Sequence, residues 1–258
     1  MTGARPIEHD AADPHAEGDV PIELGGHRLV LLAERAVFWP ARRWLLVADT
    51  HWGKCQALRQ AGAAVPSGPM QADLQRLAQV AERVGARRLV VLGDLVHGPA
   101  MLAQGLDGAV ARWRRTLACE LALVPGNHDR RLVSASGRAV LERWGIELLA
   151  EQVVVDGLAL RHEPPMRAGV ATLCGHVHPA ARLGGRHESI KLPCFWLESA
   201  YNALVLPAFS GLVDGVCVAV SPDDRRWATT GQRVVALSDA PARSAGRRRS
   251  RPDARPRR

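Results

Sequence analysis

The chain has 258 residues, of which 47% are apolar and 23% charged, a composition typical of a globular domain with one substantial core. No apolar run approaches the roughly 20 residues that cross a bilayer, so we expect no membrane-spanning helix and no membrane partner. The N-terminal residues lack an apolar signal region, and we therefore expect a cytoplasmic protein. The five cysteines are odd in number and form no C-x-x-C motif, which argues against a disulfide framework and a cysteine-based zinc site.

The formal charge of +8 is unevenly distributed along the chain. Residues 243–258 contain eight Arg and one Asp, whereas residues 1–23 contain six acidic residues and one Arg. Because both ends lack hydrophobic periodicity, we expect a disordered tail over residues 1–20, one folded domain over residues 21–240 and a disordered Arg/Pro-rich tail over residues 241–258. The body is only mildly basic, so its charge alone does not predict nucleic-acid binding. The basic tail could bind nucleic acid or simply be solvated.

Four short apolar runs, each followed directly by polar residues, predict buried strands. These runs are Trp44–Ala48, Arg88–Leu92, Glu120–Val124 and Ala171–Cys174. Helical periodicity occupies the intervals, most clearly over Met70–Val84 and Leu106–Ala118. After about residue 146 the sequence favours further short strands. These are Gln152–Val155, Leu158–Arg161, Phe195–Leu197, Ala203–Leu206, Val216–Val220 and Arg233–Leu237. An α/β half followed by a β-rich half predicts two sheets packed in one layered domain.

Polar side chains follow each of the four apolar runs. They are Asp49 and His51, then Asp94, then Asn127, His128 and Asp129, and finally His176 and His178. Because ligands of open α/β sheets bind at the carboxyl ends of the strands, we expect these side chains to converge. Gly93, Gly126 and Gly175 precede three of the sets, which indicates that the backbone comes close to something bound there.

Six of these side chains are typical metal ligands. They are Asp49, His51, Asp94, Asn127, His176 and His178. Carboxylate, imidazole and amide ligands without a thiolate suit Mn, Fe, Zn or Mg. Six ligands are too many for one tetrahedral ion and match two ions that share a carboxylate, so the sequence predicts a binuclear centre. A single D-x-H or G-D could instead belong to an ordinary turn, but four such sets in succession favour the metal centre.

The motifs D-x-H, G-D, G-N-H-D and G-H-x-H, in this order, resemble those of the calcineurin-like metallophosphoesterases. The resemblance implies a four-layer α/β/β/α sandwich with two divalent ions between two mixed sheets. It implies that one ion is held by Asp49, His51, Asp94 and His178, and the other by Asp94, Asn127, His176 and one more histidine. In this arrangement Asp94 bridges the two ions.

The additional histidine is the least certain ligand by sequence. His162 is our candidate, because it follows a predicted strand and lies 14 residues before His176. The alternatives are His97, which follows Asp94 too closely to belong to another strand, and His187, which lies in a Gly/Arg-rich loop.

Two cations would lower the pKa of a bridging water and clamp the phosphate, so the predicted reaction uses a metal-activated hydroxide and no side-chain nucleophile. The resemblance implies that His128 protonates or stabilises the leaving oxygen. Asp129 would accept a hydrogen bond from the His128 ring, or cap the following helix. Other polar residues near the crevice could contact substrate phosphates or be solvated surface. They are Lys54, His97, Arg130 and Arg131.

Further segments, among them A-E-R-A-V-F-W-P, D-T-H-W-G-K, R-H-E-P and L-P-C-F-W, resemble the bacterial ligase-associated DNA damage response endonucleases over roughly residues 28–237. This resemblance implies a Mn²⁺-dependent phosphoesterase that acts on DNA in repair, beside a helicase-like protein and an ATP-dependent DNA ligase. Trp52 and Trp113 could stack on bases or belong to the core.

Two other functions are compatible with the fold. A small-molecule phosphodiesterase or phosphomonoesterase would use the same metal centre. A catalytically inactive scaffold would be expected to have lost ligands, whereas here the set is intact.

Overall fold

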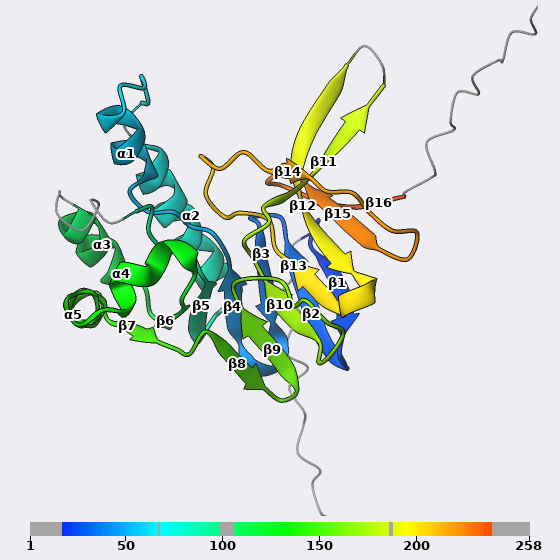
Figure 1. Cartoon of the computed structure of the whole chain (residues 1–258), viewed down its shortest axis with the longest axis horizontal. Coiled ribbons are helices and arrows are strands. Elements are labelled where there is room, and N and C mark those ends of the chain that lie inside the picture. Colours follow the sequence, from blue (N-terminus) through cyan, green and yellow to red (C-terminus); the bar gives the residue numbers. More distant parts are fainter. Residues whose placement is uncertain (1–16, 67, 99–105, 186–187, 239–258) are drawn as a thin grey trace, which may run out of the picture.

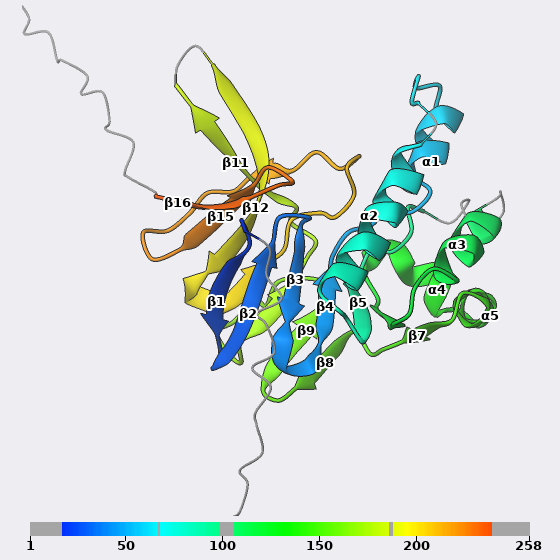
Figure 2. The same ribbon diagram turned by 180° about the vertical axis from the view of Figure 1, so that it is seen from behind.

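The computed structural model describes residues 17–66, 68–98, 106–185 and 188–238. Two β-sheets pack against each other, and helices cover the other face of the first sheet (Figures 1 and 2). The predicted C-terminal tail lies outside the described residues from residue 239 onward. Within the described ranges, no helix is both long and apolar enough to span a membrane.

The first sheet combines antiparallel and parallel strands. In spatial order it contains β1 (Val20–Leu24), β2 (His27–Leu32), β3 (Ala36–Trp39), β4 (Trp44–Val47), β5 (Arg88–Leu92), β6 (Glu120–Val124) and β7 (Ile146–Leu148). The pairings are antiparallel from β1 to β4 and parallel from β4 to β7. The central strands are apolar at successive positions because both faces are buried. In β4, for example, Leu45 and Val47 face the helices and Leu46 faces the second sheet.

Within the described residues, the α-helices all precede strand β7. They are α1 (Lys54–Gln60), α2 (Pro69–Arg83), α3 (Leu106–Arg114), α4 (Arg130–Val133) and α5 (Ala135–Arg143). Helix α2 begins at Pro69, whose fixed φ and missing N–H suit a first helical position. Its apolar stripe, which includes Leu74 and Leu77, packs in the core between helices and sheet.

The second sheet is also mixed. Its strands are β8 (Gln152–Val155), β9 (Leu158–Arg161), β10 (Thr172–Cys174), β11 (Pro179–Gly184), β12 (Ser189–Glu198), β13 (Ala203–Val205), β14 (Val216–Cys217), β15 (Arg225–Thr229) and β16 (Val234–Leu237). The order is β14-β11-β12-β13-β10-β9-β8, with β15 paired to β12 and to β16. Leu160, Leu173, Phe195 and Leu204 pack against the first sheet. The predicted pair of mixed sheets with helices is confirmed.

The outer face of the second sheet differs from the implied four-layer arrangement. Among the described residues, no α-helix follows Arg143. Cys174, Trp196 and Val205 form a small outer cluster. They are covered by Val177, Val218 and Val220, which lie in non-helical segments. Loops therefore take the place of the second helical layer.

Three strands precede Trp44, where the first predicted strand begins. Strands β1 and β2 are joined at Gly25 and Gly26, both with positive φ as a type I′ hairpin turn requires. Asp19, which falls in the predicted N-terminal tail, accepts a hydrogen bond from the Ala33 N–H at 3.1 Å and pairs with Arg83 at 2.8 Å. The folded domain thus includes Asp19 and the first residue of β1, and the predicted tail boundary is too late.

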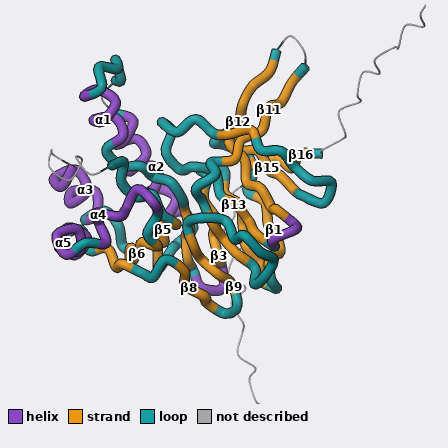
Figure 3. The backbone as a smooth tube through the Cα atoms, viewed as in Figure 1, coloured by secondary structure: helices purple, strands orange, loops and turns teal. Residues whose placement is uncertain are grey.

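The longest strand, β12, extends well beyond the predicted segment Phe195–Leu197. Its first half pairs with β11 in a hairpin that projects from the body of the molecule (Figures 1 and 3). In this part of the hairpin Leu183 lies opposite Ile190, whereas the next pair, Arg182 and Lys191, is charged, so the apolar pattern is interrupted while the backbone pairing continues.

Candidate metal centre

The polar sets predicted to converge all lie in loops that follow strands. Asp49 and His51 follow β4, Asp94 follows β5, Asn127 begins a single 3-10 turn after β6, and His176 and His178 follow β10. Five of these residues adopt the left-handed backbone conformation, which is costly for residues other than glycine and concentrates at functional sites. Their φ values are 57° for Asp49, 44° for His51, 51° for Asp94, 70° for His176 and 53° for His178. This strain has no signature in the sequence.

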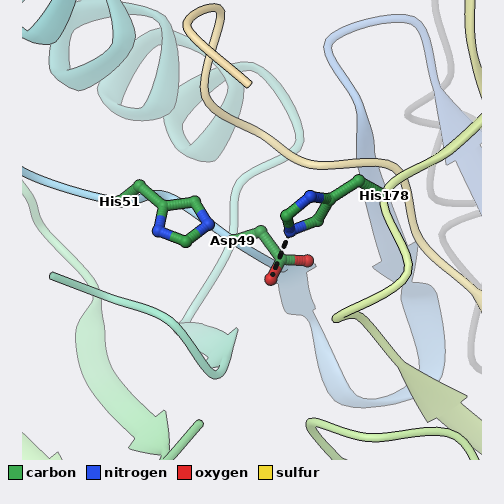
Figure 4. A group of neighbouring side chains, drawn as sticks. All are labelled: Asp49, His51 and His178. Carbon is green, nitrogen blue, oxygen red and sulfur yellow. Dashed lines mark ion pairs between the residues drawn. The ribbon is translucent and has the colours of Figure 1, made fainter. Parts of the chain in front are cut away.

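Asp49, His51 and His178 form what we call the first cluster, in which one potential ligand atom of each lies within 4.8 Å of the others. Figure 4 shows the three side chains together, and the rings of His51 and His178 meet edge-on with their centroids 5.5 Å apart. His178 Nε2 lies 3.1 Å from Asp49 Oδ1, yet both atoms are buried without a hydrogen bond within the described chain. Both ring nitrogens of His51 are likewise buried and unpaired there. Unsatisfied buried donors and acceptors that face one another fit a cation.

Asn127, His162 and His176 form the second cluster. Asn127 Oδ1 lies 3.0 Å from His162 Nε2 and 3.1 Å from His176 Nδ1, and these two nitrogens are 3.1 Å apart. Ligand atoms bound at about 2.1 Å to one octahedral cation lie about 3 Å from their neighbours. The other nitrogen of His162, Nδ1, lies 2.9 Å from the Leu92 carbonyl oxygen. As the donor to that carbonyl, Nδ1 leaves Nε2 free to act as a ligand.

Asp94 lies between the two clusters. Its Oδ1 is 3.4 Å from His162 Nε2, and its Oδ2 is 3.8 Å from His51 Nε2. The side chain is almost completely buried, and its Oδ1 also accepts a hydrogen bond from the His128 N–H at 2.9 Å. Asp49, Asp94 and His162 also form a group in which one potential ligand atom of each lies within 4.8 Å of the others. Both carboxylates therefore lie close to the place where the first and second clusters meet. The donor set on each side suits a divalent cation.

Burial keeps the imidazole of His51 neutral. Desolvation, together with the neighbouring His178, Lys54, His128 and His97, lowers the pKa of His51 to about 2. Burial and the nearby Lys54 and His128 likewise lower the pKa of His97. A neutral ring is the form of histidine that binds a metal, so the surroundings of His51 already favour ligation.

The glycines before the polar sets allow close backbone approaches. A Cβ at Gly93, where φ is +78°, would lie 2.2 Å from His162 Nδ1. A Cβ at Gly126 would lie 2.5 Å from both Asp94 N and Asp94 Oδ1, and one at Gly175 would lie 2.6 Å from Asp49 Oδ2. These glycines contact the candidate ligands themselves.

The role predicted for Asp129 as a holder of the His128 ring is wrong. The buried Asp129 carboxylate accepts hydrogen bonds from three backbone N–H groups within the described residues: Gly126 at 2.9 Å, Val96 at 3.2 Å and Leu95 at 3.3 Å. It therefore joins the loop after β5 to the turn after β6. Burial raises the pKa of Asp129 to about 6.

The His128 ring is placed by other contacts. It stacks on His97 with the ring centroids 5.5 Å apart and meets His51 edge-on at 5.3 Å. Its side chain is 40% exposed, and its Nε2 lies 3.9 Å from Asp94 Oδ2. His128 thus lies at the solvent side of the carboxylate between the clusters.

The other predicted substrate contacts are distributed around the centre. Lys54 begins α1 and is half-buried, and burial lowers its pKa. Arg130 is exposed and lines a cavity of about 340 Å³ beside Asn127 and His162, whereas Arg131 is exposed one residue further along α4. His187, the alternative ligand, lies outside the described residues.

Neither tryptophan considered for base stacking is available to a substrate. Trp52 and Trp113 are 2% and 6% exposed, and their rings meet edge-on with centroids 5.2 Å apart in the core beneath the helices. Among the described residues, the five cysteines form no disulfide with one another.

The chain matches one family model and several solved structures. The family model for calcineurin-like phosphoesterases matches residues 42–178, more than half of the chain. Among solved structures, the Pseudomonas putida nuclease MPE is 34% identical with a TM-score of 0.70, and the match covers 85% of this chain and all of that one. No curated protein gives a significant match.

Two further structural matches are much weaker. A protein of unknown function from Aquifex aeolicus is 18% identical with a TM-score of 0.34, over 56% of this chain and 81% of its own. The phosphoesterase Yfce from E. coli is 17% identical with a TM-score of 0.36, over 75% of this chain and 96% of its own. These TM-scores are too low to bear on the fold. The family model and the Pseudomonas match suffice, and the chain belongs to the calcineurin-like phosphoesterases, hydrolases of phosphoester bonds.

Proposed function

We propose that this protein is a phosphodiesterase that depends on two divalent metal ions and cleaves DNA as an endonuclease. The observation that carries the proposal is the position of Asp94, whose two carboxylate oxygens face the buried imidazoles of His51 in the first cluster and His162 in the second. Asp49, His51, Asp94 and His178 would hold one ion, and Asp94, Asn127, His162 and His176 the other. The similarity to a nuclease over the whole of that chain supports DNA as the substrate.

The bound ions would activate a water and neutralise charge on the phosphate. The chain itself supplies the carboxylate, amide and imidazole ligands and holds them close together. Leu92 orients His162, and Gly93 allows the ring to lie against the loop after β5. The oxygen and nitrogen ligands admit Mn, Fe, Zn or Mg. We propose Mn²⁺ as the resident ion, because the family resemblance favours manganese.

His128 would protonate the leaving oxygen. Its ring is 40% exposed, so that a substrate can reach it, and stacking on His97 fixes its plane. A general acid of this kind contributes about 10² to 10⁴ in rate when the leaving group is strongly basic. His97, Arg130 and Lys54 would contact the substrate from around the centre.

Hydrolysis of end-labelled single-stranded and duplex DNA by the Mn²⁺-loaded protein tests the proposal, with bis-p-nitrophenyl phosphate as a small diester. In His128→Ala, DNA cleavage should fall by about 10² to 10⁴, whereas hydrolysis of the small diester should fall by less than about tenfold. The reason is that p-nitrophenolate is weakly basic and leaves without a proton. The bound manganese should be unchanged, because His128 is not a ligand.

The alternative function is an outcome of the same assay. Turnover of the small diester without any DNA cleavage would contradict the nuclease proposal and favour a small-molecule phosphodiesterase with the same centre. Action in DNA repair in the cytoplasm, beside an ATP-dependent DNA ligase and a helicase-like protein, extends the proposal from the family resemblance. Co-purification of those two proteins with the chain would test that extension.

A further inference from the structure

Residues 208–216, which we call the strap, pass directly behind the first cluster. The Phe209 N–H donates to the carbonyl oxygen of Ala48 at 2.8 Å, and the Ser210 N–H donates to that of Asp49 at 3.3 Å. At its other end, the Val216 N–H donates to the carbonyl oxygen of His178 at 2.8 Å. One segment is therefore bonded to the backbone of two candidate ligands of the first cluster.

The strap is clamped to helix α2 by two charged side chains. Both carboxylate oxygens of Asp73 lie within hydrogen-bond distance of the Gly211 N–H, at 3.1 and 3.3 Å. Arg76 pairs with Asp73 at 2.9 Å, donates to the Phe209 carbonyl oxygen, and lies over the Phe209 ring at 4.3 Å from its centroid. Asp73 is almost fully buried, so these contacts are shielded from solvent.

A third side chain holds the strap from the first sheet. Arg35, in the turn between β2 and β3, donates to the carbonyl oxygen of Ser210 at 3.1 Å and to that of Ala208 at 3.5 Å. The strap is thus anchored both to α2 and to the turn.

The backbone of Asp49 is in a conformation that needs support from its surroundings. Asp49 is fully buried and has a φ of 57°, a conformation that persists only where the surroundings impose it. Its N–H donates to the Gly93 carbonyl oxygen at 3.1 Å, and its own carbonyl oxygen is held by the strap. The second cluster is supported through Leu92 and contacts among its own side chains. It also meets the first cluster at one point, where the His176 N–H donates to Asp49 Oδ2 at 3.0 Å.

We propose that Asp73 and Arg76 are positioning residues for the first metal site: by clamping the strap they set the affinity of the first cluster for its ion. The effect on the second cluster is much smaller, because the strap meets that cluster through the Asp49 carboxylate and not through a ligand's own backbone. This inference rests on the proposed function, because it requires that the first cluster bind a divalent cation. Neither residue contacts the ligands directly, and each acts through the strap.

Titration of the metal-free full-length protein with Mn²⁺, followed by electron paramagnetic resonance, tests the inference. The unaltered protein should show two classes of site. Asp73→Ala and Arg76→Ala should weaken one class by about 10- to 100-fold, the usual effect of losing support behind a ligand, and leave the other within about twofold. Hydrolysis of bis-p-nitrophenyl phosphate should then require more Mn²⁺ but reach nearly the original kcat at saturation.

Arg83 provides a matched control on the same helix. It pairs with Asp19 and Glu34 at 2.8 and 2.7 Å and makes no recorded contact with the strap within the described residues. Arg83→Ala should lower the melting temperature yet leave both Mn²⁺ affinities unchanged. If Asp73→Ala does not fold, Asp73→Asn, which keeps an oxygen for Gly211 but loses the charge pair, carries the test with a smaller shift in the same class.

The outcomes separate the two proposals. If the unaltered protein binds no Mn²⁺, the proposed function fails. If it binds two ions and the Asp73 and Arg76 variants retain both affinities, or lose both equally, the positioning role is overturned while the proposed function stands.

Discussion

The two clusters of the centre are held in different ways. In the first cluster all three residues have left-handed backbones. Both ring nitrogens of His51 and the Nε2 of His178 lack a hydrogen-bond partner within the described chain. In the second, the potential ligand atoms lie 3.0 to 3.1 Å apart and His162 is oriented by a carbonyl oxygen. The left-handed backbone thus extends over the whole first cluster, whereas in the second cluster His176 alone has it and contacts among the side chains contribute directly.

The first prediction removes the residue common to both clusters. Asp94→Ala should abolish high-affinity Mn²⁺ binding at both, since each loses a carboxylate oxygen, and should lower diester hydrolysis on the order of 10³-fold or more. Metal analysis of the purified protein together with steady-state kinetics measures both effects. Full occupancy by two ions in this variant would show that Asp94 is not shared.

The second prediction separates the clusters. His51→Ala should weaken one class of Mn²⁺ site by at least about 100-fold, and His176→Ala the other, because each removes a ligand from one cluster only. The resonance titration described for the strap variants distinguishes the two classes. The same class weakened by both substitutions would contradict the division into two clusters.

A third prediction concerns the backbone behind the second cluster. Gly93→Ala would place a Cβ 2.2 Å from His162 Nδ1 at a φ of +78°, so we expect a loss of about 2–4 kcal/mol in unfolding free energy and weaker binding at the second cluster. Gly157→Ala is the control, since its φ is +83° but nothing lies within 4 Å of the added Cβ. Thermal and denaturant unfolding should show a clearly smaller loss there. If Gly93→Ala and Gly157→Ala lose equal amounts of unfolding free energy, backbone strain alone explains the loss and the proposed contact with His162 is contradicted.

The smallest expected effect on the metals comes from the N-terminal anchor. Asp19→Ala breaks the pair with Arg83 and the hydrogen bond from Ala33, and should lower the unfolding free energy by about 1–3 kcal/mol without changing either Mn²⁺ affinity. Deletion of residues 1–16 should leave the melting temperature unchanged, because the contacts of the N-terminal segment within the described chain begin at Glu17, which pairs with Arg233, and Gly18, which accepts from the Val234 N–H. If Asp19→Ala changes the Mn²⁺ affinity of one class of site, the contacts of Asp19 also support that cluster and the prediction is contradicted.

Much of the centre was predictable from local patterns. The central strands of the first sheet are short apolar runs buried on both faces, and polar residues follow each at the same sheet edge. His162 could be selected because it follows an apolar strand, and it lies beside Asn127 and His176. Pattern and position suffice there because parallel strands carry their carboxyl ends to one edge.

Other features had weaker signals. Strands β1 to β3 were missed, although the turn at Gly25 and Gly26 between two apolar runs is a hairpin signal that could have revealed them. Of the long strand β12, only the apolar segment Phe195–Leu197 was predicted. Its first half was missed because the pairing with β11 that forms it is a tertiary contact. Trp52 and Trp113 were ambiguous, because a tryptophan occurs both in hydrophobic cores and on binding surfaces and the local sequence does not distinguish the two.

The sequence by itself determined the candidate ligands, their order and the strands that they follow, because apolar periodicity and residue chemistry are local properties. Only the tertiary structure decided that Asp129 joins two loops instead of holding His128, that Asp94 lies between the clusters, and that the strap reaches α2 through Asp73. Each of these depends on contacts between residues far apart in the chain, and their geometry is set when the sheets and helices pack.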